Sequence, residues 1–382
     1  MSLHRIDPRK SACNLIDKKL TFLPRSVLVT GGAGFIGSNY LHWMVSRHPE
    51  IRFVNLDLLT YAGNLANIES ISAEANYEFV QGDITDSTLV EMLFQTHGFD
   101  TVVHFAAESH VDRSIEDPLS FVRTNVIGTT ILLETARTFW QASDSMSLCR
   151  FHHVSTDEVY GSLGPTGQFL ESTPYAPRSP YAASKASSDH FVRAFAETYG
   201  LPILITNCSN NFGPYQFPEK LIPLTIVNAV SEQAIPVYGR GDNIRDWLFV
   251  LDHCEALELV LQRGTPGQTY LIGGGNEWSN LDLVNKILDR VDESLSRPEG
   301  TGRALVSFVD DRPGHDFRYS VNTDRIQAEL DWRPSHSLDE ALELTVTWYL
   351  ENQDWIECVK DESYMRYYDR MYGDRISNED DG

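Results

Sequence analysis

The chain has 382 residues, with 31 lysines and arginines against 54 aspartates and glutamates, so its formal net charge is −23. Apolar residues make up 42% and charged residues 22%, which is typical of a globular protein and argues against wholesale disorder. This acidity disfavours nucleic acid or an anionic membrane as a partner, although backbone amides and a few cations can still bind a small anion. At ~100–200 residues per domain, the length predicts two domains.

The cysteines and the N-terminal segment bear on the compartment. Five scattered cysteines with no Cys-x-x-Cys pair favour reduced thiols over disulfides or a zinc thiolate site. No apolar run approaches the ~20 residues needed to cross a bilayer. Residues 1–25 lack the apolar core of a secretory signal; their weak positive bias is compatible with a transit segment, but we expect a disordered extension. We therefore expect a cytoplasmic protein with no metal site.

From Ser26 onward, short apolar runs alternate with longer segments in which apolar residues recur at helical spacing. This alternation predicts an α/β fold over residues 26–210, with a doubly wound parallel sheet of the Rossmann type and helices on both faces. In chain order, the predicted strands are residues 27–29, 53–56, 77–80, 102–105, 151–154 and 203–206, and the predicted helices are residues 36–45, 89–94, 119–139 and 181–199.

After about Asn210 the pattern changes to closely spaced prolines and shorter elements. We expect residues 211–360 to form a smaller region that mainly binds substrate, with some segments returning to the sheet. Residues 235–238 and 270–272 are predicted strands, and residues 280–292 a predicted helix. The acidic residues 361–382, with interleaved tyrosines, predict a solvated tail or a surface helix.

A glycine-rich turn, residues 30–37, joins the first predicted strand to the first predicted helix. Glycines here permit a tight turn and close backbone approach to a pyrophosphate, which the amides at the helix N-terminus would face. Asp57 ends the next strand, where a carboxylate accepts hydrogen bonds from a ribose diol and repels a 2′-phosphate, so NAD is favoured over NADP. Alternatively, Asp57 caps a helix. Asp83 follows the third strand and is either an adenine contact or a turn residue.

Tyr181 and Lys185 lie four residues apart and therefore on one face of a predicted helix. A phenol is a poor base at neutral pH unless a cation stabilises the phenolate, which Lys185 and a nicotinamide ring can do together. The pair suits removal of a proton from a sugar hydroxyl while hydride leaves the same carbon. Thr156, just after a strand at the ligand-binding edge of the sheet, can hydrogen-bond the reacting oxygen.

These motifs resemble the extended short-chain dehydrogenase/reductase superfamily and, within it, the dTDP-glucose 4,6-dehydratases. The second resemblance is carried by residues 104–112, 155–161, 207–221 and 311–316, and the match runs from about residue 27 to about residue 349. The consecutive acids Asp157 and Glu158 give it specificity, because the epimerases of the superfamily generally lack them.

The resemblance implies a hydro-lyase of deoxysugar biosynthesis that converts dTDP-glucose to dTDP-4-keto-6-deoxyglucose. C4 is oxidised, Glu158 removes the C5 proton, a protonated Asp157 assists loss of the C6 hydroxyl, and hydride returns to C6, so NAD is recycled. The alternatives are a nucleotide-sugar 4-epimerase, a 4,6-dehydratase of another nucleotide sugar, or a non-enzymatic NAD-bound protein that kept the fold.

The resemblance also implies the binding residues and a homodimer, formed by residues 119–139 and 181–199 of each subunit as a four-helix bundle. Arg245 is the expected bidentate phosphate contact, unless it only pairs with Asp242 or Asp246 at the surface. The implied cofactor contacts are Gly31, Gly34, Phe35, Ile36, Gly37, Asp57, Thr60, Asp83, Ile84, Ala106, Ala107, Ser109, Thr124, Tyr181, Lys185 and Asn211. The implied substrate contacts are His110, Thr156, Asn210, Lys220, Leu221, Pro236, Val237, Tyr238, Arg245, Asn280, Asp311, Arg312 and His315.

Overall fold

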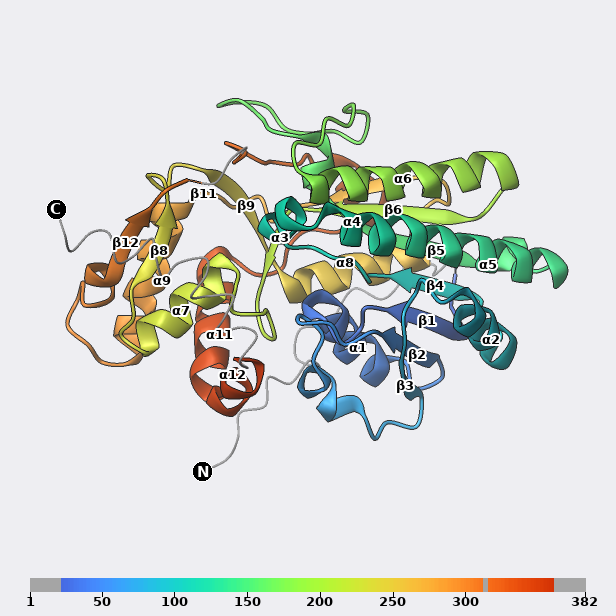
Figure 1. Cartoon of the computed structure of the whole chain (residues 1–382), viewed down its shortest axis with the longest axis horizontal. Helices are drawn as coiled ribbons and strands as arrows, with labels where there is room; N and C mark the ends of the chain where they lie inside the picture. Colours follow the sequence, from blue (N-terminus) through green and yellow to red (C-terminus); the bar gives the residue numbers. More distant parts are fainter. Residues whose placement is uncertain (1–21, 312–314, 361–382) are drawn as a thin grey trace.

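The larger of two lobes is built on a seven-stranded sheet in the computed structural model, which describes residues 22–311 and 315–360 (Figure 1). The strand order is β10-β6-β5-β4-β1-β2-β3, and every neighbouring pair is parallel. This confirms the Rossmann-type fold. The strands are β1 (Ser26–Thr30), β2 (Arg52–Asp57), β3 (Tyr77–Gln81), β4 (Thr101–His104), β5 (Arg150–Thr156), β6 (Ile203–Cys208) and β10 (Thr269–Ile272).

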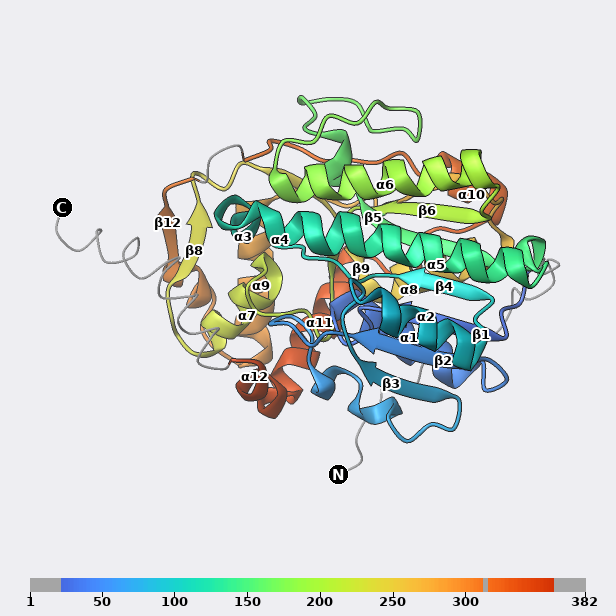
Figure 2. The same cartoon turned by 45° about the vertical axis from the view of Figure 1, so that its right-hand side comes forward.

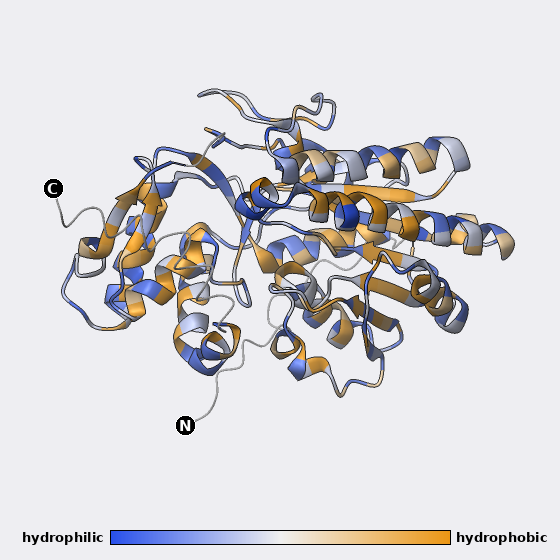
Figure 3. Ribbon diagram, in the orientation of Figure 1, coloured by the Kyte–Doolittle hydropathy of each residue, from blue (hydrophilic) through white to orange (hydrophobic). Residues whose placement is uncertain are grey.

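Helices cover both faces of this sheet because successive strand residues point to opposite sides. Leu28 packs with α2, α5 and α6 on one face, whereas Val27 and Val29 pack with α1, α8 and α10 on the other. The strands are the most hydrophobic part of this lobe (Figure 3), and α5 and α6 lie side by side (Figure 2). The helices are α1 (Phe35–Arg47), α2 (Ser87–His97), α5 (Thr129–Ala142), α6 (Pro180–Tyr199), α8 (Val250–Arg263) and α10 (Asp324–Leu330).

The predicted helix at residues 119–139 is interrupted in its hydrogen bonding. It consists of α4 (Pro118–Phe121), a π-helical segment (Val122–Gly128) and α5. Such wide turns are rare and often occur at functional sites. Here the π-helical segment carries Thr124 into the wall of a cavity described below. The short helix α3 (Val111–Glu116) precedes it.

The smaller lobe has its own apolar core, formed by helices packed on short strands. The predicted strand at 235–238 and helix at 280–292 lie here, whereas the predicted strand at 270–272 is β10 and belongs to the large sheet. The elements of the smaller lobe are β7 (Asn210–Phe212), β8 (Ile235–Tyr238), β9 (Ile244–Phe249), β11 (Glu277–Ser279), β12 (Val306–Val309), α7 (Leu221–Val230), α9 (Asn280–Ser294), α11 (Leu338–Glu351) and α12 (Gln353–Val359).

The two chain ends are described only in part. Of the expected N-terminal extension, the structure describes residues 22–25: the Phe22 amide donates to the Gln262 carbonyl at 3.0 Å, and the Arg25 amide donates to the Asp100 carboxylate. The expected tail or helix at residues 361–382 lies outside the described residues. Among the helices at residues 22–311 and 315–360, none has the length and apolar character of a membrane span.

Candidate active site

Two adjoining cavities lie where the carboxyl ends of the parallel strands face the smaller lobe. Open α/β sheets bind ligands at this edge. The first, about 330 Å³, runs along the glycine-rich turn and the ends of β2, β4 and β5. The second, about 550 Å³, lies mostly against the smaller lobe. They share part of their walls, formed by Ser109, Glu158, Asn210, Asn211, Gln216, Glu219 and Lys220.

The glycine-rich turn has room for backbone but not for side chains. Gly31 has φ +73°, and a Cβ added there would lie 2.6 Å from the Ala106 nitrogen; one added at Gly37 would lie 2.3 Å from the Gly31 carbonyl oxygen. Helix α1 begins directly after the turn, at Phe35. The strand–turn–helix context predicted for a diphosphate site is therefore present.

Asp57 stands at the end of β2 in the first cavity, where the sequence predicts a ribose contact. Its carboxylate accepts a hydrogen bond from the amide of Ala33 (2.9 Å), which ties it to the glycine-rich turn, and another from the amide of Leu59 (2.8 Å) just after β2. Burial raises the pKa of Asp57, and the two amide bonds oppose that rise. A charged carboxylate here disfavours a 2′-phosphate.

Every residue predicted to contact the cofactor lines the first cavity. They come from the glycine-rich turn, the ends of β2, β3 and β4, the π-helical segment, α6 and β7. Asp83 is also the turn residue of the alternative interpretation, because its carboxylate accepts the Thr85 amide at 2.8 Å. The shape of the turn, the placement of Asp57 and this continuous lining fit a dinucleotide such as NAD.

Tyr181 and Lys185 lie at the start of α6, both buried and both in the wall of the first cavity. The Lys185 ammonium donates to the Val154 carbonyl at 2.9 Å, which fixes it against β5. Burial lowers the pKa of Lys185, whereas burial and the charge of Glu158 raise the pKa of Tyr181 well above its usual value. Tyr181 is therefore a neutral phenol in the free protein, and its ionisation needs additional positive charge in the cavity.

The turn that follows β5 carries the two consecutive acids. Thr156 caps it by accepting the Glu158 amide at 3.3 Å, and Thr156 and Glu158 both line the first cavity. Asp157 differs from expectation, because its side chain is 2% exposed and lines neither cavity. Its Oδ2 atom is buried without a hydrogen-bond partner in the described part of the chain.

The burial of Asp157 has an electrostatic consequence. Burial raises its pKa well above the usual value, and the charges of Glu158 and Asp246 raise it further. A protonated Asp157 at neutral pH is what the acid role requires. The role itself stays a prediction, since its carboxyl group lies behind the cavity wall in this structure.

The second cavity collects cations and amides from distant segments of the chain. Arg245 is 6% exposed, and its guanidinium donates to the carbonyls of Ile244 (2.8 Å) and Asp316 (2.9 Å). It is therefore not a surface ion-pair residue; Asp242 instead pairs with Arg240. Asn210 and Asn280 each bury a side-chain oxygen without a hydrogen-bond partner among the described residues. The predicted substrate residues that line this cavity are His110, Asn210, Lys220, Leu221, Pro236, Tyr238, Arg245, Asn280 and His315.

Of the four other predicted substrate residues, the three that the structure describes lie elsewhere. Val237 is 1% exposed in the core of the smaller lobe, because alternate residues of β8 face opposite sides and only Pro236 and Tyr238 face the cavity. Asp311 is outside the lining but holds His315, with 2.6 Å between the carboxylate and Nδ1. Thr156 lines the first cavity, and Arg312 is outside the described residues.

Sequence reasoning missed several residues of the cavity walls. Glu219 is the most notable, because its buried carboxylate lines both cavities and lies 3.7 Å from His110 Nε2 and 4.0 Å from Arg113 Nε. Its position beside Lys220 was the available signal. The other missed residues include Arg178, Gln216, Trp247, Asp316 and Tyr319. No cluster of three metal-ligating side chains occurs in residues 22–311 and 315–360.

Comparisons with known proteins agree with this geometry. The profile of the GDP-mannose 4,6 dehydratase family matches residues 28–345. A dTDP-glucose 4,6-dehydratase of Xanthomonas campestris pv. campestris (strain B100) is 55% identical over 340 residues, covering 88% of this chain and 96% of the relative. The solved structure of DesIV, a dTDP-glucose 4,6-dehydratase from Streptomyces venezuelae with NAD bound, is 46% identical with a TM-score of 0.80, covering 88% of this chain and all of that one. A UDP-glucose 4-epimerase from Thermotoga maritima is 26% identical with a TM-score of 0.75, covering 86% and 99%.

Proposed function

Because the chain belongs to the dTDP-glucose 4,6-dehydratase family, we propose that it is an NAD-dependent hydro-lyase acting on dTDP-glucose. The product is dTDP-4-keto-6-deoxyglucose, and water is lost with no net oxidation or reduction. The observation that supports this most strongly is the position of Glu158, which lines both cavities next to Tyr181 and Lys185. A base in the wall that the two cavities share can reach a sugar carbon next to the one being oxidised.

The first cavity provides the dinucleotide site. Amides of the glycine-rich turn would face the diphosphate, Asp57 the adenosine ribose, and Tyr181 and Lys185 the nicotinamide side. When bound, NAD supplies an acceptor for hydride from sugar C4 and later a donor of hydride to C6. In the second cavity, Arg245, Lys220 and the amides of Asn210 and Asn280 provide a nucleoside diphosphate with donors inside an otherwise acidic protein.

Side chains of the protein carry out the proton transfers of the reaction. Tyr181 accepts the proton of the C4 hydroxyl as a phenolate, which the positive charges of Lys185 and of bound NAD would favour, with Thr156 positioned to hydrogen-bond the same oxygen. The C4 ketone acidifies the C5 hydrogen, which Glu158 removes as a proton. The C6–oxygen bond then breaks, and a proton from Asp157 completes the departing water. After hydride reaches C6, a proton returns to C5, and the ketone at C4 remains.

The test is product analysis. Purified protein with NAD and dTDP-glucose is expected to form an alkali-absorbing keto sugar lighter by one water. An epimerase would give a product of unchanged mass, and a non-enzymatic protein would give none. A panel of dTDP-, UDP-, GDP- and CDP-glucose, compared by kcat/KM, identifies the nucleotide; the proposal requires the dTDP sugar to rank first.

A homodimer is a further part of the proposal. Large apolar side chains are exposed along α4, the π-helical segment and α6, and they include Leu119 (64% exposed), Val122, Ile127 and Phe191. Exposed apolar side chains on these elements favour burial against a partner, and a second copy would form the expected four-helix bundle. Sedimentation as a monomer at micromolar concentration would contradict the dimer. A cytoplasmic location is supported by the thiols of the four described cysteines, none of which forms a disulfide.

A further inference from the structure

A ladder of four polar residues runs along the buried face of α6. Tyr181, Lys185, Asp189 and Arg193 follow one another at intervals of four, so each lies one turn beyond the last. The first two line the cofactor cavity, whereas Asp189 lies behind it and is completely buried. A buried carboxylate is costly unless several groups stabilise it.

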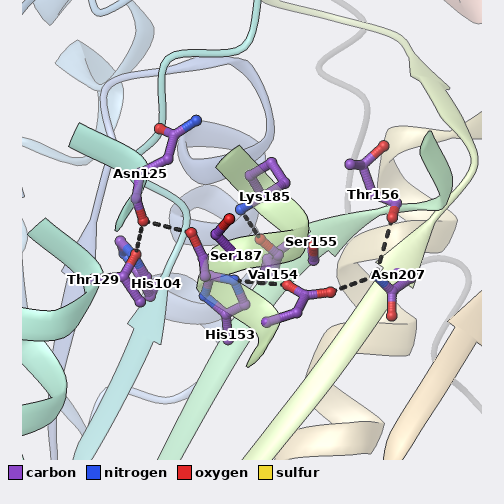
Figure 4. A network of polar contacts seen from close by, with 12 residues as sticks. His104, Asn125, Thr129, His153, Val154, Ser155, Thr156, Lys185, Ser187 and Asn207 are labelled. Atoms are coloured by element: carbon purple, nitrogen blue, oxygen red, sulfur yellow. Dashed lines mark hydrogen bonds and ion pairs between the residues drawn. The ribbon is translucent and has the colours of Figure 1, made fainter. Parts of the chain in front are cut away.

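The contacts of Asp189 extend to the turn after β5 that carries Asp157 and Glu158. Its Oδ2 accepts hydrogen bonds from the Tyr175 hydroxyl (2.6 Å) and the Asn207 side-chain amide (3.1 Å), and Oδ1 lies 3.1 Å from His153 Nε2. The same Asn207 amide donates to the Thr156 carbonyl at 3.0 Å (Figure 4). One carboxylate thus connects α6, β5, β6 and the residue that caps the turn of the consecutive acids.

The charges along this ladder depend on one another. Burial opposes the charge of Asp189, but the His153 ring beside it and the charge of Lys185 lower its pKa to about 2. Burial lowers the pKa of Lys185, and Asp189 is the strongest influence that opposes this. Burial and the charge of Lys185 lower the pKa of His153 to about 4, so its ring is neutral at pH 7. The titratable groups facing Lys185 and Asp189 are His104 on β4, His153 on β5, Tyr160 and Tyr175 after β5, Arg193 on α6 and Cys208 on β6.

We propose that Asp189 is a positioning residue for the reaction: its carboxylate keeps the Lys185 ammonium charged beside the cofactor and, through Asn207, fixes the Thr156 backbone. The inference rests on the proposed function, since it assigns to Asp189 the support of both the oxidation step and the elimination step. It also gives the buried Lys185, whose own hydrogen bond goes to the neutral Val154 carbonyl, a negative charge that opposes the effect of burial on its pKa.

The experiment follows NADH absorbance in single turnovers of the NAD-loaded enzyme with dTDP-glucose, from about pH 5.5 to 9. In Asp189→Asn, NADH formation is expected to slow about tenfold at neutral pH, because Tyr181 loses the support of charged Lys185. For the same reason, the acid limb of the plot of NADH formation rate against pH is expected to move up by about one pH unit. Tyr175→Phe is the matched control: it removes a hydrogen bond from the same carboxylate but keeps the charge, so its acid limb should stay in place.

The outcomes separate the claims. If wild-type enzyme forms no NADH, the proposed function fails. If wild type is active and the Asp189→Asn limb superimposes on it, the role of Asp189 toward Lys185 is overturned. Asn207→Leu tests the second link and keeps the proposal testable if Asp189→Asn does not fold: the NADH that forms should decay more slowly than in wild type, because elimination precedes hydride return. Wild-type decay in Asn207→Leu would overturn the link to Thr156.

Discussion

The two sides of the cleft are built in different ways. The cofactor side is made by backbone geometry, in which a glycine-rich turn and the ends of neighbouring parallel strands leave a groove that side chains would fill. The substrate side is made by side chains such as His110, Arg245 and Asn280, which come from segments far apart in the chain. The first depends on space and the second on charge and hydrogen bonding, so the two should respond to different mutations.

The largest effect on activity is expected for Glu158, in the wall that the two cavities share. Glu158→Gln keeps the shape of the side chain but removes the base, so kcat should fall by ~10²–10⁴. C4 oxidation should persist, and NADH should accumulate in a single turnover. Glu357→Gln, on the exposed surface of α12, is the control and should behave as wild type. Full activity of Glu158→Gln would contradict the assignment of Glu158 as the base of the elimination.

The next effect tests the cofactor side alone. In Gly31→Ala the new Cβ would overlap the Ala106 backbone, so the turn must shift and lose amide contacts with the diphosphate. We expect Kd for NAD to rise about hundredfold, equivalent to ~3 kcal/mol. Gly98→Ala is the matched control, because Gly98 also has positive φ (+59°) but has nothing within 4 Å of a Cβ. It should cost about 1–2 kcal/mol of stability and leave NAD binding unchanged, as titration calorimetry can measure. Equal losses of NAD binding would mean that backbone strain, not space, is decisive.

The substrate side is tested by Arg245→Lys. Lysine keeps the charge but cannot donate to the Ile244 and Asp316 carbonyls and to a phosphate in the same planar geometry. KM for dTDP-glucose should rise about tenfold, with little change in kcat or in NAD affinity. Arg240→Lys, an exposed residue that pairs with Asp242, should change none of these constants. A loss of NAD affinity in Arg245→Lys would contradict the separation of the two sides.

The last prediction concerns the pH dependence of stability. Burial lowers the pKa of His152 and His253 to about 3 and that of His153 to about 4. In the unfolded chain, a histidine has a pKa of ~6.5, so the unfolded state binds more protons below that pH. The free energy of unfolding should therefore fall as pH drops from ~6.5 to ~4, by about 1 kcal/mol per pH unit for each histidine.

Two variants sharpen this measurement. His152→Leu removes one of these histidines and should make denaturant-derived stability less steep between about pH 6 and 5. His336→Gln should leave the slope between about pH 6 and 5 nearly unchanged. Its hydrogen bond to Asp252 raises the pKa of His336, so the stability that it contributes is fully present below ~pH 6.5 and is lost only as pH rises through the folded pKa. Identical slopes in the two variants would contradict the assignment.

The sequence anticipated the cofactor side better than the substrate side for a physical reason. Residues of the glycine-rich turn, Asp57 and the Tyr181–Lys185 pair are recognisable from local spacing, and parallel strands bring their carboxyl ends to one edge. Side-chain direction in the smaller lobe is set by long-range packing, which is why Val237 faces the core although its two neighbours face the cavity. Local spacing also could not reveal that Asp157 is buried, nor which of the segments expected to return to the large sheet supplies β10.

The wall that both cavities share has a consequence for the order of events. A nucleotide sugar seated against Asn210, Gln216 and Glu219 would stand between the dinucleotide and the solvent on that side. NADH would then remain bound until the sugar has left. The 4-keto intermediate and NADH would then stay together through one catalytic cycle, and neither would be released before hydride returns to C6.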